Sequence, residues 1–248
     1  MGVDSWVQRK LAAGLQRIVG RLAGARRRLR RAEARRFNAA QAPELPRAFH
    51  AFLRHQQISA HRQPLKGRDL WLLLEQTRPS RIVELGSGTT SAVFALWARR
   101  QMARYTAYEH HEGWAAVTEQ CLAEAGLIPD GSPVRLEPVR TAADGNSTGF
   151  VTDLPTDADF VYVDGPPCVL PSGRKVPNDD VTRLLDAGGR PAAIVVDGRV
   201  QTVDLILRHR IGREYAFSPG YEYCVDKQMW LRGVMAGEHS VFLRRPTV

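Results

Sequence analysis

RIVELGSGTTSAVFALWAR, residues 81–99, is the stretch of sequence that decides the fold. Its first part, 81–85, is a short apolar run that predicts a buried strand. Gly86 and Gly88 then predict a sharp turn, because a residue without a Cβ lets the backbone bend tightly and approach a ligand closely. The apolar segment 91–99 predicts a helix whose first amide groups point at the same turn.

The same alternation of strand and helix continues along the chain. Further strands are predicted at 103–108, 134–139, 159–163, 192–196, 212–217 and 240–243, and helices at 47–57, 69–76, 113–125, 180–187 and 202–209. Short apolar strands that alternate with helices indicate a parallel sheet covered on both faces. We therefore expect an α/β fold of the doubly wound, Rossmann-like kind, with a mainly parallel seven-stranded sheet and an N-terminal helical extension.

The N-terminal extension differs from the remainder in charge. Residues 1–36 hold eleven basic side chains against two acids, which accounts for the whole net charge of +9. Apolar residues recur every three or four positions from Leu11 to Leu29 and predict one amphipathic helix over about 5–37. Because Pro43 and Pro46 follow, we divide the chain into a basic helical arm, 1–42, and a main domain, 43–248.

Three partners are compatible with such an arm. Its apolar stripe could pack on the body or on a second copy of the chain. An apolar stripe beside a basic face also suits a helix that lies on an anionic membrane surface. Nucleic acid is the third alternative and the least favoured, because aromatic residues for base stacking are nearly absent from the arm.

The sequence predicts a cytoplasmic location, with attachment to the periphery of a membrane as an alternative. No apolar run approaches the length of about 20 residues that spans a bilayer, and the first residues lack the apolar core of a secretory signal. The cysteines are Cys121, Cys168 and Cys224, an odd number with no CxxC spacing. That pattern argues against a disulfide framework and suits a reducing compartment.

Two acids are placed to recognise different parts of one ligand. Glu84 lies two residues before the first glycine, so its negative charge should repel a pyrophosphate and suit the sulfonium and amino group of an amino-acid cofactor. Glu109 ends the second predicted strand, where an acid accepts hydrogen bonds from both hydroxyls of a ribose. His110 and Trp114 follow, and an adenine ring could rest against them.

Over about residues 68–200 the sequence resembles the Class I S-adenosylmethionine-dependent methyltransferases. In that family an acid-x-Gly-x-Gly turn binds the methionine part of the cofactor, and the acid after the second strand binds its ribose. The resemblance implies S-adenosyl-L-methionine as cofactor and a binding site made of Glu84, Gly86, Ser87, Gly88, Thr89, Glu109, His110 and Asp164. A nicotinamide-binding turn is disfavoured, because Ser91 stands where such a turn needs a third glycine.

Two later strands end in acids that the resemblance places near the reacting methyl group. Asp164 follows the strand 159–163, and Asp197 follows the strand 192–196. We predict catalytic roles for Asp164, Asp197 and His110, since a neutral hydroxyl must lose its proton as it is methylated. The alternative is structural, with Asp164 capping a turn and Asp197 capping the next helix.

A divalent metal held by Asp164 and Asp197 is a further alternative, because related enzymes use such acids to bind magnesium or manganese. Gly198 counts against it, since metal-binding members place a carboxamide or a second acid at that position. The expected reaction is methyl transfer to a hydroxyl of a small molecule or a sugar. A methyltransferase acting on nitrogen or on a macromolecule, or a non-catalytic binding protein with this fold, are the alternatives.

Overall fold

A computed structural model of the chain describes residues 28–29, 31–56, 63–128, 131–210, 214–218 and 239–245. The described strands form a seven-stranded sheet in the order β3-β2-β1-β6-β7-β9-β8. Its strands are β1 (Arg81–Leu85), β2 (Arg104–Glu109), β3 (Val134–Leu136), β6 (Phe160–Val163), β7 (Ala193–Asp197), β8 (Tyr215–Ser218) and β9 (His239–Arg244). The first five are parallel and β9 is antiparallel to both of its neighbours, which confirms the predicted fold class.

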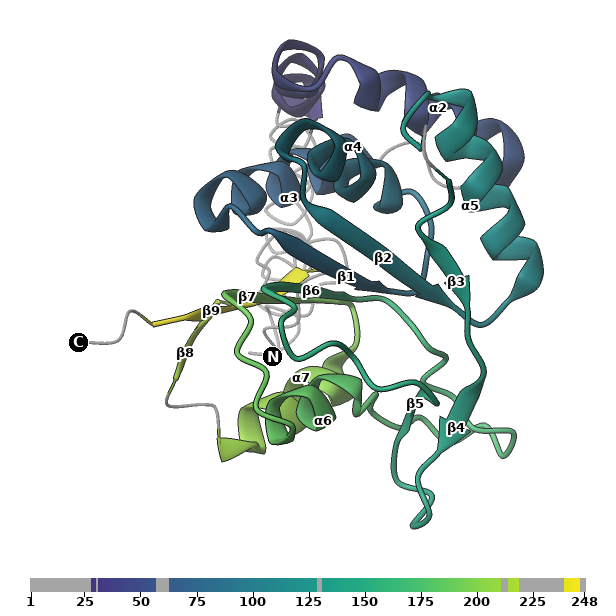
Figure 1. Ribbon diagram of the computed structural model, residues 1–248, viewed down its shortest axis with the longest axis vertical. Helices are drawn as coiled ribbons and strands as arrows, with labels where there is room; N and C mark the ends of the chain where they lie inside the picture. Colours follow the sequence, from purple (N-terminus) through teal and green to yellow (C-terminus); the bar gives the residue numbers. More distant parts are fainter. Residues whose placement is uncertain are drawn as a thin grey trace, which may run out of the picture.

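Helices cover both faces of this sheet (Figure 1). One face is covered by α2 (Glu44–Gln56), α3 (Gln63–Thr77), α4 (Ser91–Gln101) and α5 (Glu112–Glu124), and the other by α6 (Asp180–Asp186) and α7 (Val200–Arg208). Alternate residues of the buried strands point to opposite faces, so each strand supplies both halves of the core. Ile82 and Phe160 pack under the first group of helices, whereas Val83 and Val161 pack with α6 and α7.

The chain adds β2 and β3 on one side of β1 and then crosses to add β6 and β7 on the other side. Strand β1 pairs in parallel with β2 on one side and with β6 on the other, so the helix after β1 and the later helix after β6 lie on opposite faces. A crevice opens at such a point at the carboxyl ends of the strands, and ligands of open α/β sheets bind there. The glycine turn that follows β1 lies at this place.

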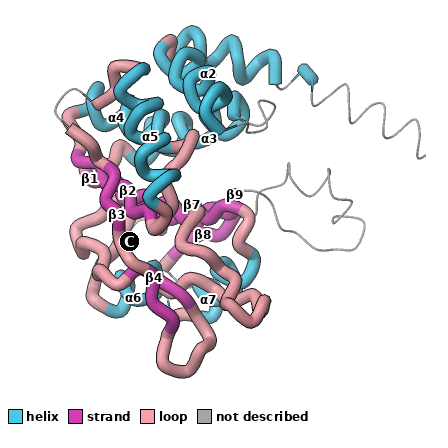
Figure 2. Tube along the Cα trace, turned by 90° about the vertical axis from the view of Figure 1, so that its right-hand side faces the viewer, coloured by secondary structure: helices cyan, strands magenta, loops and turns pink. Residues whose placement is uncertain are grey.

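Two sequence predictions are corrected. The strand predicted over 134–139 ends at Leu136, because Pro138 has no amide to donate to a strand ladder. Residues after it form a hairpin of β4 (Val139–Thr141) with β5 (Thr148–Phe150), and β4 lies away from the seven-stranded sheet (Figure 2). The helix predicted over 69–76 begins earlier, at Gln63, so residues between the two predicted helices 47–57 and 69–76 are helical from Gln63 onward.

The beginning of the described chain packs on the body. Residues 31–41 are helical, Ala34 is fully buried, and Asn38 Nδ2 donates a hydrogen bond of 2.9 Å to the Pro64 carbonyl at the start of α3. The helix predicted over 5–37 lies outside the described residues up to residue 27, and the division at residue 42 stays a prediction. Within the described part of the chain, no helix has the length and apolar character needed to cross a membrane.

Candidate active site

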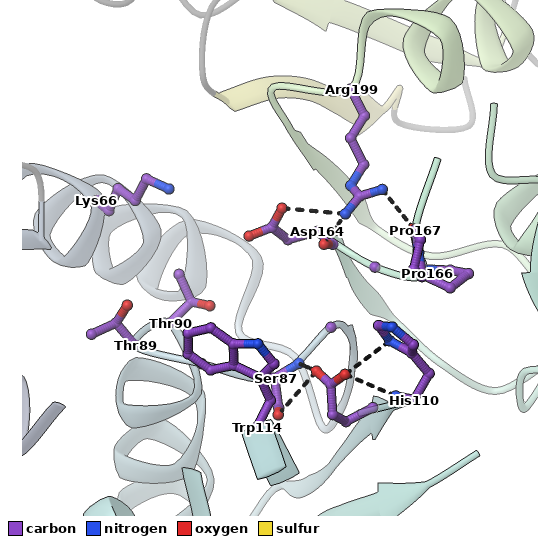
Figure 3. A pocket seen from close by; sticks show the side chains of 14 residues that line it. Lys66, Ser87, Thr89, Thr90, His110, Trp114, Asp164, Pro166, Pro167 and Arg199 are labelled. Carbon is purple, nitrogen blue, oxygen red and sulfur yellow. Dashed lines mark hydrogen bonds and ion pairs between the residues drawn. The ribbon is translucent and has the colours of Figure 1, made fainter. Parts of the chain in front are cut away.

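A cavity of about 300 Å³ opens where β1, β2 and β6 end (Figure 3). The turn after β1 forms its floor, the end of β2 forms one side, and the loop after β6 forms the other. The lining residues are Lys66, Gly86, Ser87, Gly88, Thr89, Thr90, Glu109, His110, Trp114, Asp164, Gly165, Pro166, Pro167 and Arg199. Seven of the eight residues predicted to bind the cofactor therefore meet around one space, and Glu84 is the exception.

The floor is built by two glycines that touch across neighbouring strands. Gly86 has φ of +88°, and a Cβ on it would lie 2.7 Å from the amide nitrogen of Gly165. A Cβ on Gly165 would in turn lie 2.6 Å from the Cα of Gly86. Gly88 differs, because a Cβ there would meet no atom within 4 Å. Gly86 and Gly165 therefore let two backbones pack together, whereas Gly88 leaves space in the cavity.

Glu84 lies beneath the turn and does not line the cavity. Its carboxylate is fully buried and accepts hydrogen bonds from Thr90 Oγ1 at 2.5 Å, Ser91 Oγ at 2.6 Å and the hydroxyl of Tyr105. The prediction that this carboxylate contacts the ligand is therefore corrected. Thr90 and Ser91 hold it at the start of α4 and Tyr105 holds it from β2, so its role in this structure is to shape the glycine turn.

Glu109 is held in place by the backbone around it. One carboxylate oxygen accepts from the amides of His110 and His111 at 2.8 and 2.9 Å, and the other accepts from the amide of Ser87 at 2.9 Å. The side chain is 5% exposed, and that small part faces the cavity. His110 Nδ1 lies 3.0 Å from the same carboxylate, so His110 belongs to this side of the cavity.

Asp164 begins the loop after β6, and about half of its side chain is exposed. Arg199 donates to the main-chain carbonyls of Asp164 and Pro166 and to the Asn178 side chain, and thereby holds this loop against the end of β7. Loss of water on the side of the carboxyl group that faces the protein, and the charge of Asp197, raise the pKa of Asp164, although Arg199 and Lys66 act to lower it. A carboxylate with a raised pKa is a stronger base than an ordinary one.

Asp197 lies behind the cavity wall in a buried polar cluster. Lys66 Nζ lies 2.5 Å from Asp197 Oδ2, the Tyr162 hydroxyl donates to the same oxygen at 2.8 Å, and His239 Nε2 lies 3.4 Å from that hydroxyl. Burial acts to raise the pKa of Asp197, but nearby positive charge and these hydrogen bonds lower it overall. Burial also lowers the pKa of His239, so Lys66 is the relevant cation near neutral pH.

This placement changes two predictions for Asp197. Its side chain is 7% exposed and is not part of the cavity wall, so direct contact with a reacting group is not what the geometry favours. It does not cap α7 either, because Arg199 occupies the N-cap position of that helix without a side-chain hydrogen bond to it. Asp197 instead holds the ammonium of Lys66, which does line the cavity.

Lys66 and Arg199 are the charged residues of the cavity lining that the sequence analysis missed. Lys66 precedes Asp197 by 131 residues, lies between the helices predicted at 47–57 and 69–76, and belongs to no motif. Arg199 comes shortly after the end of a predicted strand. This position could have identified it as a site residue, because side chains at the carboxyl ends of neighbouring parallel strands converge. Nothing in the sequence marked Lys66.

The residues present do not fit a divalent metal. Lys66 Nζ lies 2.5 Å from Asp197 Oδ2 and Arg199 lies 3.6 Å from Asp164 Oδ1, so a cationic side chain already faces each carboxylate. Across the described ranges, no three His, Cys, Asp or Glu side chains gather in a group that could hold an ion. The side chains of Lys66 and Arg199 neutralise the negative charge of Asp197 and Asp164, which a metal ion would otherwise do.

Comparison with known proteins identifies the fold. No protein-family model and no curated protein matches the sequence. Among solved structures, a Klebsiella pneumoniae protein described as a "putative O-methyltransferase" is similar with a TM-score of 0.51 at 15% identity, over 86% of this chain and 96% of that one. The O-methyltransferase from Bacillus cereus in complex with SAH is similar with a TM-score of 0.48 at 16% identity, over 84% of this chain and 96% of that one. The SAH-bound methyltransferase PaMTH1 from Podospora anserina gives 0.45 at 16% identity, over 82% and 88%.

The chain is thus an α/β protein with a cavity at the switch point of a doubly wound sheet. Its fold, with five parallel strands followed by an antiparallel pair, is the Rossmann-like fold of methyltransferases.

Proposed function

We propose that this chain is an S-adenosyl-L-methionine-dependent methyltransferase that acts on a hydroxyl group of a small molecule or a sugar. The observation that carries the proposal is the meeting of Glu109, the open turn at Gly88 and Asp164 around one cavity at the ends of β1, β2 and β6. The fold of the solved methyltransferase structures supports it.

The cavity offers complementary groups for each part of the cofactor. The carboxylate of Glu109, oriented by three backbone amides, would accept hydrogen bonds from the ribose hydroxyls. The exposed Trp114 ring and His110 line the same cavity, where they would contact the adenine (Figure 3). The amide groups at the start of α4 and the space over Gly88 would receive the amino-acid end. When bound, the cofactor supplies an activated methyl group on its sulfonium.

Asp164 is the residue we assign as general base. It lines the cavity together with Glu109, about half of its side chain is exposed, and its pKa is raised. A hydroxyl bound beside it would pass its proton to the carboxylate as the oxygen becomes methylated. His110 is assigned to cofactor binding rather than to catalysis, because it contacts Glu109.

The test is calorimetric titration with S-adenosylmethionine and with S-adenosylhomocysteine. We expect both to bind the wild-type protein, and we expect Glu109→Gln to weaken binding roughly 10- to 100-fold, because it removes hydrogen bonds to a charged group. Glu112→Gln is the matched control: it removes an exposed carboxylate three residues away and should bind as the wild type does. A wild-type protein that binds neither compound contradicts the proposal.

A cytoplasmic location, and attachment of the arm 1–42 to a membrane surface or to a second copy, are proposed on sequence alone. The methyl acceptor is sought by screening phenols and sugars for release of S-adenosylhomocysteine. Methylation of an amine or a macromolecule instead would favour the alternative enzyme class. Cofactor binding without any transfer would favour a non-catalytic binding protein.

A further inference from the structure

Lys66 enters the cavity from an element outside the parallel strands and their loops. It lies on the first turn of α3, its side chain is 18% exposed, and its Nζ points toward Asp164 in Figure 3. It is close enough to Asp164 to act on the pKa of that carboxyl group. The same ammonium lies 2.5 Å from Asp197, so it faces the two acids that end neighbouring strands.

The start of α3 is held firmly by the helices beneath it. Gly67 packs so closely on Phe49 that an added Cβ would lie 2.8 Å from its ring. Asn38 donates to the carbonyl of Pro64, one turn before Gly67. Because Pro64 before Lys66 is hydrogen-bonded and Gly67 after it is closely packed, the ammonium of Lys66 has a defined place relative to the strand ends.

A purely structural ion pair between Lys66 and Asp197 is the plain alternative. Moving two charges out of water often costs more free energy than their mutual attraction returns. A buried ion pair by itself is therefore weak evidence that the pair stabilises the fold. Lys66 also lines the cavity, and an ion pair with only a structural role does not require that position. The Tyr162 hydroxyl donates to the same Asp197 oxygen that Lys66 contacts, and so fixes this oxygen beside the lysine.

We propose that the ammonium of Lys66 takes the place of a divalent cation beside Asp164 and Asp197 and holds the oxygen of the acceptor hydroxyl. The inference deepens the proposed function and rests on it. A fixed positive charge near that oxygen stabilises the negative charge that develops as the proton leaves, which is what a metal ion would do there.

In the transfer step, one bond forms, one bond breaks, and the proton has an acceptor. The acceptor oxygen forms a bond to the methyl carbon, its proton passes to the carboxylate of Asp164, and the electron pair of the broken carbon–sulfur bond stays on the sulfur. Lys66 keeps its protons throughout and supplies charge only. Asp197 is a positioning residue in this scheme, because it acts through Lys66.

The first test needs no acceptor. Manganese ion is titrated by calorimetry into the wild type, Lys66→Ala and Lys66→Met, with thermal melting to show that each variant is folded. Without the ammonium, two carboxylates are left to share a cation, so we expect both variants to bind manganese at least about tenfold more tightly than the wild type. The gain should disappear in Lys66→Ala combined with Asp197→Asn. Equal binding by the wild type and both single variants overturns the inference.

The second test measures transfer to phenol, catechol and methyl glucoside. We expect Lys66→Met to lower kcat about 100-fold, with S-adenosylhomocysteine bound as tightly as by the wild type, and Lys66→Arg to recover part of the rate. Lys175→Met, an exposed lysine away from the cavity, should match the wild type. Activity that requires added magnesium, or transfer by Lys66→Met at the wild-type rate, overturns the inference alone.

The two proposals fail in different ways. A wild-type protein that binds no cofactor overturns the proposed function, and the inference with it. A wild type that binds cofactor but methylates none of the three probes overturns the inference, which commits to a hydroxyl acceptor, and leaves cofactor binding established.

Discussion

Glu84 shows how one buried carboxylate shapes a turn without contacting the ligand. It lies under the glycine turn with three hydroxyl donors around it, and burial raises its pKa to about 7, with a smaller contribution from the charge of Asp164. The hydrogen bonds from Ser91, Thr90 and Tyr105 act in the opposite direction but do not outweigh burial. Near neutral pH the protonated and ionised forms therefore coexist beneath the site.

This pKa predicts a pH dependence of stability. The pKa is higher in the folded chain than the ordinary value of 4.5, so the stability linked to Glu84 is fully present below about pH 4.5 and is lost as the pH rises through about 7. Glu84→Gln cannot ionise. Its free energy of unfolding relative to the wild type should therefore rise by about 3 kcal/mol over that range.

Denaturant unfolding at pH 5, 6, 7 and 8 measures this difference. Glu112→Gln, which removes an exposed carboxylate, should follow the wild type at every pH. Parallel stability curves for Glu84→Gln and the wild type would show that Glu84 ionises normally in the folded chain.

At the scale of elements, the site depends on how the turn after β1 meets the loop after β6. Gly86 and Gly165 pack backbone against backbone, so neither position has room for a Cβ. Gly88, two residues along the same turn, has no neighbour within 4 Å of an added Cβ and lies outside the left-handed region of backbone conformation. One turn thus contains a glycine needed for packing and another that keeps the cavity open.

Alanine at these positions should separate the two roles. Gly165→Ala should lower the free energy of unfolding by about 1–3 kcal/mol, because the two backbones must move apart. Gly88→Ala should melt as the wild type does but bind S-adenosylhomocysteine at least about tenfold more weakly, since the methyl group enters the cavity. Thermal melting and calorimetry on the same samples check both. Equal melting temperatures for the wild type and Gly165→Ala would contradict the packing argument.

At the scale of the whole molecule, the first described residues belong to the packed body. Ala34 and Asn38 are buried, and Asn38 reaches the start of α3, the helix that carries Lys66. On the other side of α2, Glu44 accepts from Arg99 and Arg100 at the end of α4. These contacts join the N-terminal helices to the layer that covers the site.

Asn38→Ala should therefore affect both stability and the site. Loss of the hydrogen bond to Pro64 should cost about 1 kcal/mol of unfolding free energy, and the looser start of α3 should lower the rate of transfer. Gln41→Ala, an exposed position three residues later, is the control. Unfolding in denaturant measures the first effect. A stability equal to that of the wild type would mean that residues near 38 do not support α3.

The fold was predictable because its signals are local. Apolar runs such as AIVVD at 193–197 are too short for helices and are buried on both faces, as a central parallel strand requires. The strand at 134–139 was predicted too long, since Pro138 interrupts the ladder. Gly86, Gly88 and Glu109 were likewise identifiable, because a turn and the acid after the next strand lie at fixed places in a parallel sheet.

The sequence by itself determined the alternation of strands and helices, the glycine turn and the acid at the end of β2, since each is encoded within a few neighbouring residues. Only the tertiary structure decided that Glu84 faces hydroxyls beneath the turn, that Asp197 lies behind the cavity wall, and that Lys66 pairs with it. The physical reason is distance along the chain. The direction of a buried charge depends on which partners packing brings to it, and Lys66 and Asp197 meet only after the whole sheet and its covering helices have formed.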